Sequence, residues 1–233
     1  MRSDQRPLRS VLDGFESRKP TSDGRAALRV PEPFEGAEPV DIDLSVHDLE
    51  SRRDLFATLT ARRSMLRYSR APVRTELVIG LLQEALARDT STWSLDEEAG
   101  PLEGFVFALR SEGLPTGVYR VTASGCSRVA PVEVIGEPEE LGVQREFVTG
   151  GGVISVFGDL DRADSWAGSH GYRICLVRAA MVAYDFHMRL QSTGLVGTIF
   201  GGFIAASVRD TAKSDGVTRQ PLLSSTYAHP IGL

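Results

Sequence analysis

"GYRICLVRAAMVAYDFHMRLQSTG", residues 171–194, predicts the element around which the rest of the fold is built. Apolar side chains occupy nearly every side of the helix that this stretch would form, and its final glycine suits the left-handed position that commonly follows a helix. We therefore predict one long helix over residues 171–193, followed by Gly194. Because a helix that is apolar on most sides is poorly suited to face water, it should lie at the centre of the domain or at a subunit interface.

The segments on either side of this helix indicate strands. "GGVISVFGDL" (151–160) is a short continuous apolar run, typical of a strand buried on both faces. Residues 195–210 form a glycine-rich strand and loop that lead into a short helix, and residues 220–233 form a last strand. Nearer the N-terminus, residues 104–112 and 117–125 are two strands joined by the glycine- and proline-containing turn "GLPTG".

Two further helices are predicted before these strands. Asp48 can cap a helix that continues to about Ser64, and its apolar positions, spaced for one buried face, are Leu49, Leu55, Phe56 and Leu59. Residues 74–88 form an amphipathic helix, whose inward positions are Leu77, Leu81, Leu82, Ala85 and Leu86. Helices that precede strands, which are in turn interleaved with helices, place the chain in the α+β class.

The N-terminal part of the chain differs from the rest. Pro31, Pro33 and Pro39 interrupt any regular helix, so we predict an extended arm over residues 1–47 that wraps onto the domain formed by residues 48–233, or onto a partner subunit. A disordered leader is an equally good interpretation of the first 27 residues. The N-terminus lacks the apolar core of a signal peptide, and no apolar run reaches the roughly 18 residues of a membrane span, which favours a cytoplasmic protein.

The composition excludes several classes of function. The chain has 233 residues, 42% of them hydrophobic and 24% charged, with a formal net charge of −5. An acidic protein of this kind is unsuited to nonspecific nucleic-acid binding. Cys126 and Cys175 are far apart and read as reduced, packed cysteines, and the scattered histidines show no metal-ligand spacing. We therefore expect no metal site, no nucleic acid and no membrane.

Cations are nevertheless concentrated in one short stretch. "ARRSMLRYSRAPV" (61–73) contains Arg62, Arg63, Arg67 and Arg70, with Ser64 between them. The stretch could be a solvated helix end, a nucleic-acid patch, a set of carboxylate partners or half of a phosphate-binding site. The net acidity of the chain argues against the nucleic-acid patch, and the others stay open.

Four stretches, in order along the chain, resemble the nitroreductase superfamily and, within it, the SagB-type dehydrogenases. "ARRSMLRYSRAPV" is similar to the arginine-arginine-serine opening of the superfamily, and "GLPTGVYRVTASG" (113–125) to a proline-glycine-tyrosine segment of the SagB type. Residues 167–195 resemble the segment that leads into and along the family's long helix, and "VGTIFGGF" (196–203) resembles the glycine turn after it. The resemblance covers residues 29–233.

This resemblance implies a nitroreductase-like fold, in which a mixed sheet is flanked by helices, and a dimer with FMN at the subunit interface. It aligns Arg62, Arg63 and Ser64 with the residues that hold the FMN phosphate, a dianion suited to arginine and hydroxyl donors. It aligns Gly201 and Gly202 with a turn whose missing side chains let the backbone approach the flavin ring. SagB-type members oxidise azolines to azoles on ribosomally made peptides, which is the activity that the resemblance implies.

The chain also departs from the family at several positions. The phosphate cation expected two residues after the serine is Leu66, and Arg67 follows one position late, turned by about 100° on a helix. The serine- and glycine-rich loop after the second helix is replaced by residues 89–101. The lysine-tyrosine pair that removes the substrate proton aligns with Trp166 and Ala167, neither of which can transfer a proton at neutral pH. No catalytic residue is assigned.

Other chemically suggestive residues have simpler interpretations. "DLDRAD" (159–164) lacks the glycine and distal glutamate of a calcium loop and is read as a solvated turn. His187 is interpreted as a core or interface histidine rather than a ligand or base. Tyr172 and Arg173 match family positions and either orient the substrate or flavin or cap the long helix.

Two hypotheses of different class follow. The first is an FMN-dependent oxidoreductase that tailors a peptide or peptide-derived substrate. The second is a catalytically lapsed nitroreductase fold that serves as a scaffold or partner subunit in a peptide-modifying complex. In both, the partner is a second copy of the chain or another nitroreductase-like subunit. A generic NAD(P)H-dependent nitroreductase is a weaker third reading.

Overall fold

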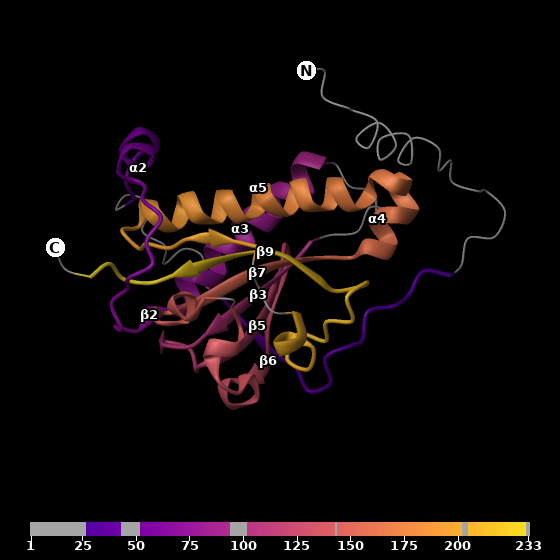
Figure 1. Ribbon diagram of the computed structural model, residues 1–233, viewed down its shortest axis with the longest axis horizontal. Coiled ribbons are helices and arrows are strands. Elements are labelled where there is room, and N and C mark those ends of the chain that lie inside the picture. The colour runs from indigo at the N-terminus through magenta and orange to yellow at the C-terminus, as the bar shows by residue number, and fades with distance from the viewer. Residues whose placement is uncertain (1–26, 43–51, 94–101, 143, 202–204, 232–233) are drawn as a thin grey trace, which may run out of the picture.

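The structure is a computed structural model that describes residues 27–42, 52–93, 102–142, 144–201 and 205–231. At its centre lies a seven-stranded sheet with the order β1-β6-β5-β3-β7-β9-β8. Each pair of neighbours in this sheet is antiparallel, and the parallel pairing of β2 with β4 belongs to a separate two-stranded sheet. The architecture is therefore α+β, with the helices α3 and α5 packed on the large sheet (Figure 1).

Each strand predicted from the sequence has a counterpart in the large sheet, namely β3, β5, β7, β8 and β9. The strands of the large sheet are β1 (Glu38–Val40), β3 (Glu103–Ala108), β5 (Gly117–Thr122), β6 (Gly125–Pro131), β7 (Gly152–Gly158), β8 (Ile199–Phe200) and β9 (Gln220–Tyr227), and the small sheet contains β2 (Val73–Arg74) and β4 (Ser111–Glu112). Every residue of β7 is buried, as its continuous apolar sequence predicts. Strand β6 and the short helices η4 (Val132–Ile135), η5 (Pro138–Glu140) and η6 (Arg145–Val148) were not predicted.

The long helix is confirmed. Helix α5 spans Gly171–Ser192, and Gly194 has the left-handed backbone (φ 87°) expected after it. The other predicted amphipathic helix is α3 (Thr75–Trp93), which continues five residues beyond the predicted end at residue 88. The remaining short helices are α2 (Leu55–Ala61), α4 (Leu160–Ala167), η7 (Gly168–His170) and η8 (Ala205–Val208).

Two apolar clusters hold the layers together, one on each face of the large sheet. The first packs α3 and α5 against the sheet and includes Leu82, Ile154 and Phe186. The second lies on the opposite face and includes Phe105 and Phe157, whose ring centroids are 4.6 Å apart. Burial of both faces explains why β3 and β7 read as continuous apolar runs rather than as alternating ones.

Helix α2 corrects the prediction for the first helix. It starts at Leu55, where Asp54 accepts a hydrogen bond from the Ala57 N–H at 3.0 Å, and it ends at Ala61. The proposed cap Asp48 and the position Leu49 lie outside the described residues. The predicted buried face is wrong within one chain, because Leu55 and Phe56 are 64% and 81% exposed and Leu59 is also exposed.

The acidic stretch at 159–164 is a second correction. It is not a solvated turn, because Asp159 caps helix α4 by accepting a hydrogen bond from the Arg162 N–H at 3.0 Å. Within the described residues, no group of three or more potential metal ligands is found. The stretch is therefore a helix start, as the preference of aspartate for this position explains.

Residues 27–42 run along the domain as an extended segment. Strand β1 pairs with β6, and Phe34 lies 5.9 Å from the ring of Phe105 and under the guanidinium of Arg219 at 4.6 Å. Lys213 pairs with Glu32 at 2.6 Å. These contacts place this part of the predicted arm on the domain of its own chain; the boundary at residue 47 stays a prediction.

Neither cysteine is in a disulfide. Cys175 is buried and Cys126 half-buried, and both are free. Burial raises the pKa of both thiols, to about 11 and about 12 respectively, so both are protonated at neutral pH. None of the described helices has both the length and the apolar character of a membrane span.

Candidate functional site

The arginine stretch lies at the end of helix α2. Arg62 is the residue that follows the last helical turn, and its N–H donates to the Thr58 carbonyl at 2.8 Å. Ser64 then forms a parallel bridge with Gly197, and the Met65 N–H donates to the Gly197 carbonyl at 3.3 Å. Residues 62–65 are thus fixed beside the chain that leads from α5 into β8.

The Arg63 side chain stabilises the end of α2. Its Nη1 donates to the Thr60 carbonyl at 3.0 Å and to the Arg62 carbonyl at 2.8 Å. A cation is favourable at this position because the last carbonyls of a helix carry partial negative charge. The atoms through which Arg63 could also hold an anion are therefore Nε and Nη2.

The cations of this stretch have no acidic partners in the part of the chain that the structure describes. No ion pair involves Arg62, Arg63, Arg67 or Arg70 there, whereas arginines in other elements pair with acids, such as Arg178 with Asp89 at 2.7 Å. The interpretation of the stretch as a set of carboxylate partners is therefore wrong for the described residues. Local positive charge that no acidic side chain neutralises is suited to an anionic ligand.

The glycines after α5 differ in whether the structure leaves space for a side chain. A Cβ on Gly197 would lie 2.1 Å from the Thr226 carbonyl oxygen, so only glycine permits this close approach of Ser64, Gly197 and β9. Gly201 is exposed, and a Cβ there would have Leu223 as its nearest neighbour at 4.0 Å. Space is therefore open beside Gly201, while Gly202 lies outside the described residues. Gly197 was missed, although it belongs to the glycine-containing stretch 196–203.

Gly201, the described one of the two predicted ring glycines, follows shortly after Gly197, the residue that pairs with Ser64. From Gly197, beside Ser64, to Gly201 the chain is four residues long, which spans at most about 14 Å. The donor set of two guanidinium groups and a hydroxyl, followed by an open glycine, fits a flavin nucleotide with its phosphate at Arg62–Ser64. The assignment of Arg62, Arg63, Ser64, Gly201 and Gly202 as an FMN site stays a prediction.

A series of hydrogen bonds between buried side chains connects the arginine stretch to helix α5 and strand β9. The Gln191 side chain accepts a hydrogen bond from the Arg63 N–H at 3.3 Å and donates to the Arg63 carbonyl at 3.2 Å. Its amide nitrogen is also 2.7 Å from His187 Nε2, and His187 Nδ1 is 3.3 Å from Ser225 Oγ. Burial and the charge of Arg62 lower the pKa of His187 to about 4. His187 is thus a buried core residue, as predicted, whereas Gln191 was not singled out.

The positions at which the sequence differs from the pattern it resembles lie in two places. Leu66 and Arg67 are exposed and lie within the arginine stretch, shortly after Ser64. Trp166 and Ala167 end helix α4, which packs on the N-terminal end of α5 (Figure 1). Gln191, which contacts Arg63, lies near the other end of α5, about 30 Å away along the helix. Within one chain, the structure does not bring Trp166 and Ala167 to the arginine stretch.

Tyr172 and Arg173 lie at the same remote end of α5. Tyr172 is 54% exposed, and an Arg173 guanidinium nitrogen lies beside His170 Nδ1. Neither residue reaches the arginine stretch of its own chain, and their roles at a substrate or flavin stay a prediction.

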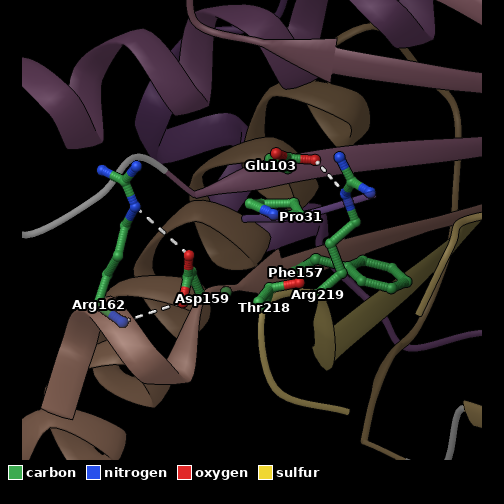
Figure 2. Close-up of a pocket in the computed structure, with 8 residues that line it drawn as sticks. Pro31, Glu103, Phe157, Asp159, Arg162, Thr218 and Arg219 are labelled. Carbon is green, nitrogen blue, oxygen red and sulfur yellow. Dashed lines mark hydrogen bonds and ion pairs between the residues drawn. The ribbon is translucent and has the colours of Figure 1, made fainter. Parts of the chain in front are cut away.

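A cavity of about 130 Å³ lies elsewhere, between residues 27–42 and the domain (Figure 2). Glu103 accepts from Arg219 Nε at 3.3 Å and from Arg120 Nη2 at 2.9 Å, and Asp159 pairs with Arg162 at 3.5 Å. Burial alone would raise the pKa of Glu103, but the hydrogen bonds and charges of these arginines outweigh it and lower the pKa. Because its acids and bases pair with each other, this cavity is a poorer candidate for an anion site than the arginine stretch.

Comparisons with known proteins define the fold. No protein-family model and no curated protein matches this chain. A protein from Anabaena variabilis described as a nitroreductase superposes with a TM-score of 0.69 and 19% identity, over 95% of this chain and 47% of its own. This chain therefore spans about half the length of that structure.

Two other solved structures also superpose on this chain. A chain of the E. coli microcin synthetase McbBCD complex with truncated pro-MccB17 bound matches with a TM-score of 0.58 and 15% identity, over 96% of this chain and 82% of that one. A protein from Exiguobacterium sibiricum, described as a nitroreductase in complex with FMN, matches with a TM-score of 0.51 and 14% identity, over 77% and 90%. On this likeness, the chain has a nitroreductase-like α+β fold.

Proposed function

We propose that this protein is an FMN-dependent oxidoreductase similar to the SagB-type dehydrogenases, and that it oxidises a peptide or a small peptide-derived substrate. The observation that carries the proposal is the arginine stretch, whose four cations have no acidic partner among the described residues and which adjoins the chain leading to Gly201. Nitroreductase-like folds include a structure described as bound to FMN, which supports this ligand. A cytoplasmic location is part of the proposal.

In this proposal each residue has one role. Arg62, through its guanidinium, and Arg63, through Nε and Nη2, hold the phosphate, and Ser64 donates its hydroxyl. Gly201 and Gly202 leave room for the backbone to approach the flavin ring. FMN, when bound, supplies the hydride acceptor for the dehydrogenation. The chain contributes orientation and charge, and no residue is assigned to move a proton.

A second subunit belongs to the proposal as well. Helix α5 exposes an apolar row on the side that faces away from the sheet, formed by Val177, Met181 and Tyr184, and helix α2 exposes Leu55, Phe56 and Leu59 nearby. Exposed apolar area of this kind is typical of a protein interface. The partner is a second copy or another nitroreductase-like chain. The matched chain of a synthetase complex with a bound peptide precursor supports a peptide-modifying context.

The second candidate is a scaffold that has lost its chemistry. It is favoured by Trp166 and Ala167, which stand where an acid/base pair would be needed and which offer no proton-transferring group. A scaffold of this kind would keep the fold and the apolar row on α5 but would not need the phosphate site. Flavin content therefore separates the two candidates.

The test is flavin binding by the purified protein. We expect a yellow protein, or a colourless one that takes up added FMN, with FMN identified by mass spectrometry of the released small molecule. The double variant Arg62→Gln/Arg63→Gln should lose FMN, whereas Arg67→Gln/Arg70→Gln, which removes the same charge from the same stretch, should keep most of it. Circular dichroism and thermal unfolding check that both variants are folded like the wild type. A wild type that binds no FMN, or two variants that lose it equally, would contradict the proposal.

A further inference from the structure

One side chain, that of Gln191, binds both the backbone N–H and the backbone carbonyl of Arg63. Gln191 Oε1 accepts from the Arg63 N–H at 3.3 Å, and Gln191 Nε2 donates to the Arg63 carbonyl at 3.2 Å. Gln191 is only 5% exposed and lies on the last turns of α5, which is packed against the sheet. The contact therefore ties an exposed loop residue to a rigid element.

Only one orientation of the Gln191 amide satisfies these bonds. Turned by 180°, its NH₂ group would face the Arg63 N–H, and its oxygen would face the Arg63 carbonyl. The second hydrogen of Nε2 then points to His187 Nε2 at 2.7 Å, which must act as an acceptor. Neutral His187 consequently carries its proton on Nδ1, which donates to Ser225 Oγ at 3.3 Å.

The lowered pKa of His187 agrees with this arrangement. A protonated imidazole would present an N–H to the Gln191 NH₂ group, and both would be donors. Burial and the nearby charge of Arg62 keep the pKa at about 4, so the acceptor is present at neutral pH. Ser225 in turn donates to the Thr226 carbonyl at 3.2 Å, which anchors the chain of bonds in β9.

We propose that Gln191, held in one amide orientation by His187, is a positioning residue that sets the geometry of the Arg62–Arg63–Ser64 segment for a phosphate-terminated ligand. The inference rests on the proposed FMN function for the identity of that ligand. Without the clamp, Arg63 keeps its side-chain bonds to the end of α2, but its peptide groups lose their fixed direction. The Met65 N–H still bonds to the Gly197 carbonyl, so the loss is confined to the Arg63 peptide groups and, through them, to the direction in which Arg63 and Ser64 approach a ligand.

The test compares two flavins on one variant. Gln191→Leu should raise the Kd for FMN about tenfold, because a precisely placed charge-assisted contact is lost. Riboflavin lacks the phosphate, so its affinity should not change. Gln83→Leu, at a half-buried glutamine of helix α3, is the matched control and should alter neither. In the FMN-free protein, amide exchange of Arg63 should be faster in Gln191→Leu than in the wild type.

The role of His187 is tested by a double-mutant cycle. His187→Leu should also weaken FMN binding, but it should have no further effect in the Gln191→Leu background, because it acts through that residue. An unchanged FMN Kd in Gln191→Leu, or an equal loss of FMN and riboflavin, would overturn the positioning role. Faster Arg63 exchange in a protein that binds no FMN at all would instead uphold the clamp and reject the proposed function.

Discussion

Leu66 is the residue at which the proposed phosphate site differs most clearly from the family that the sequence resembles. It stands where a third cation is expected, two residues after Ser64, and its side chain is 44% exposed. A charge-assisted hydrogen bond contributes about 1.5–3 kcal/mol. Leu66→Arg should therefore bind FMN about ten- to a hundredfold more tightly than the wild type.

The measurement is flavin fluorescence during titration, with a matched substitution as the control. Leu59→Arg introduces the same side chain at a position that is 45% exposed on helix α2, and it should leave the FMN affinity within about twofold of the wild type. Equal tightening by both variants would show that nonspecific charge, rather than a cation at position 66, is responsible.

His187 links the same site to pH. Its pKa is about 4 in the folded protein and near 6.5 when unfolded, so folding favours the neutral form. Its stabilising contribution is complete above pH 6.5 and is lost as the pH falls toward 4. We expect the free energy of unfolding to drop by about 2 kcal/mol between pH 7 and pH 5 through this group.

Urea unfolding at a series of pH values tests this, with His187→Gln as the comparison. Between pH 6.5 and pH 5 the wild type should lose stability with a steeper slope than the variant, because His170 and His229 are not buried and remain in both proteins. Parallel slopes would mean that His187 titrates normally.

At the scale of single residues, the sequence indicates which residue types suit a ligand, but not which distant residues contact them in the fold. Arg62, Arg63 and Ser64 can be proposed from the sequence, because the resemblance aligns them with a phosphate site and their types suit a phosphate; that role stays a prediction. Gln191 was missed, since a glutamine in a helix carries no signal until folding places it beside Arg63, which is 128 residues away. Gly197 was missed because its close approach to Thr226 is a property of the assembled sheet.

Helices show most clearly what a periodic pattern can and cannot establish. The bounds of α5 were predicted, because they depend on local sequence. So was the spread of its apolar side chains beyond the face that packs on the sheet. The pattern in α2 predicted a buried face, yet Leu55, Phe56 and Leu59 face outward in the single chain. Periodicity indicates that a face needs a partner but does not say whether that partner lies in the same chain.

The apolar row on α5 leads to a prediction about association. Val177 is 53% exposed on that row, and burying it against a second chain would make a charge there costly. The wild type should be dimeric at micromolar concentration, and Val177→Glu should shift it to monomer. Light scattering after size-exclusion chromatography measures this.

A valine on another element provides the control. Val134 is 51% exposed in η4, which packs near β5 and β6 rather than near α5. Val134→Glu should therefore leave the dimer intact. A monomeric wild type, or dissociation by both variants, would contradict an interface on α5.

At the scale of the whole molecule, the class was predictable and the order of the strands was not. Strand order depends on which segments meet, and β1 reaches the edge of the sheet only because residues 27–42 cross the domain to pair with β6. The contact of Glu32 with Lys213 joins positions that are far apart in sequence and carries no local pattern. The short helix η6 before β7 likewise buries Phe147 and Val148 in the second apolar cluster, a contact that no local periodicity indicates.

The distance between the two ends of α5 bears on the chemistry. Azoline oxidation requires a hydride acceptor and a base that removes the adjacent proton. The arginine stretch lies at one end of α5, and Trp166 and Ala167 lie about 30 Å away at the other. One bound flavin could meet both only if two subunits contributed. The chain contains two lysines, Lys19 and Lys213, and Lys213 pairs with Glu32.

We therefore expect the wild-type protein with FMN to oxidise azoline peptides slowly, since a missing general base costs about 10²- to 10⁴-fold in rate. Trp166→Lys/Ala167→Tyr should raise the rate, because in the proposed dimer it supplies the lysine-tyrosine pair that the resembled dehydrogenases have at these positions. The same double substitution in the Val177→Glu background should not, because a monomer cannot bring the two ends of α5 together. Azole formation followed by mass spectrometry measures the rates. Wild-type turnover of about 1 per second or more, or equal rescue in the monomeric background, would show that the base lies elsewhere.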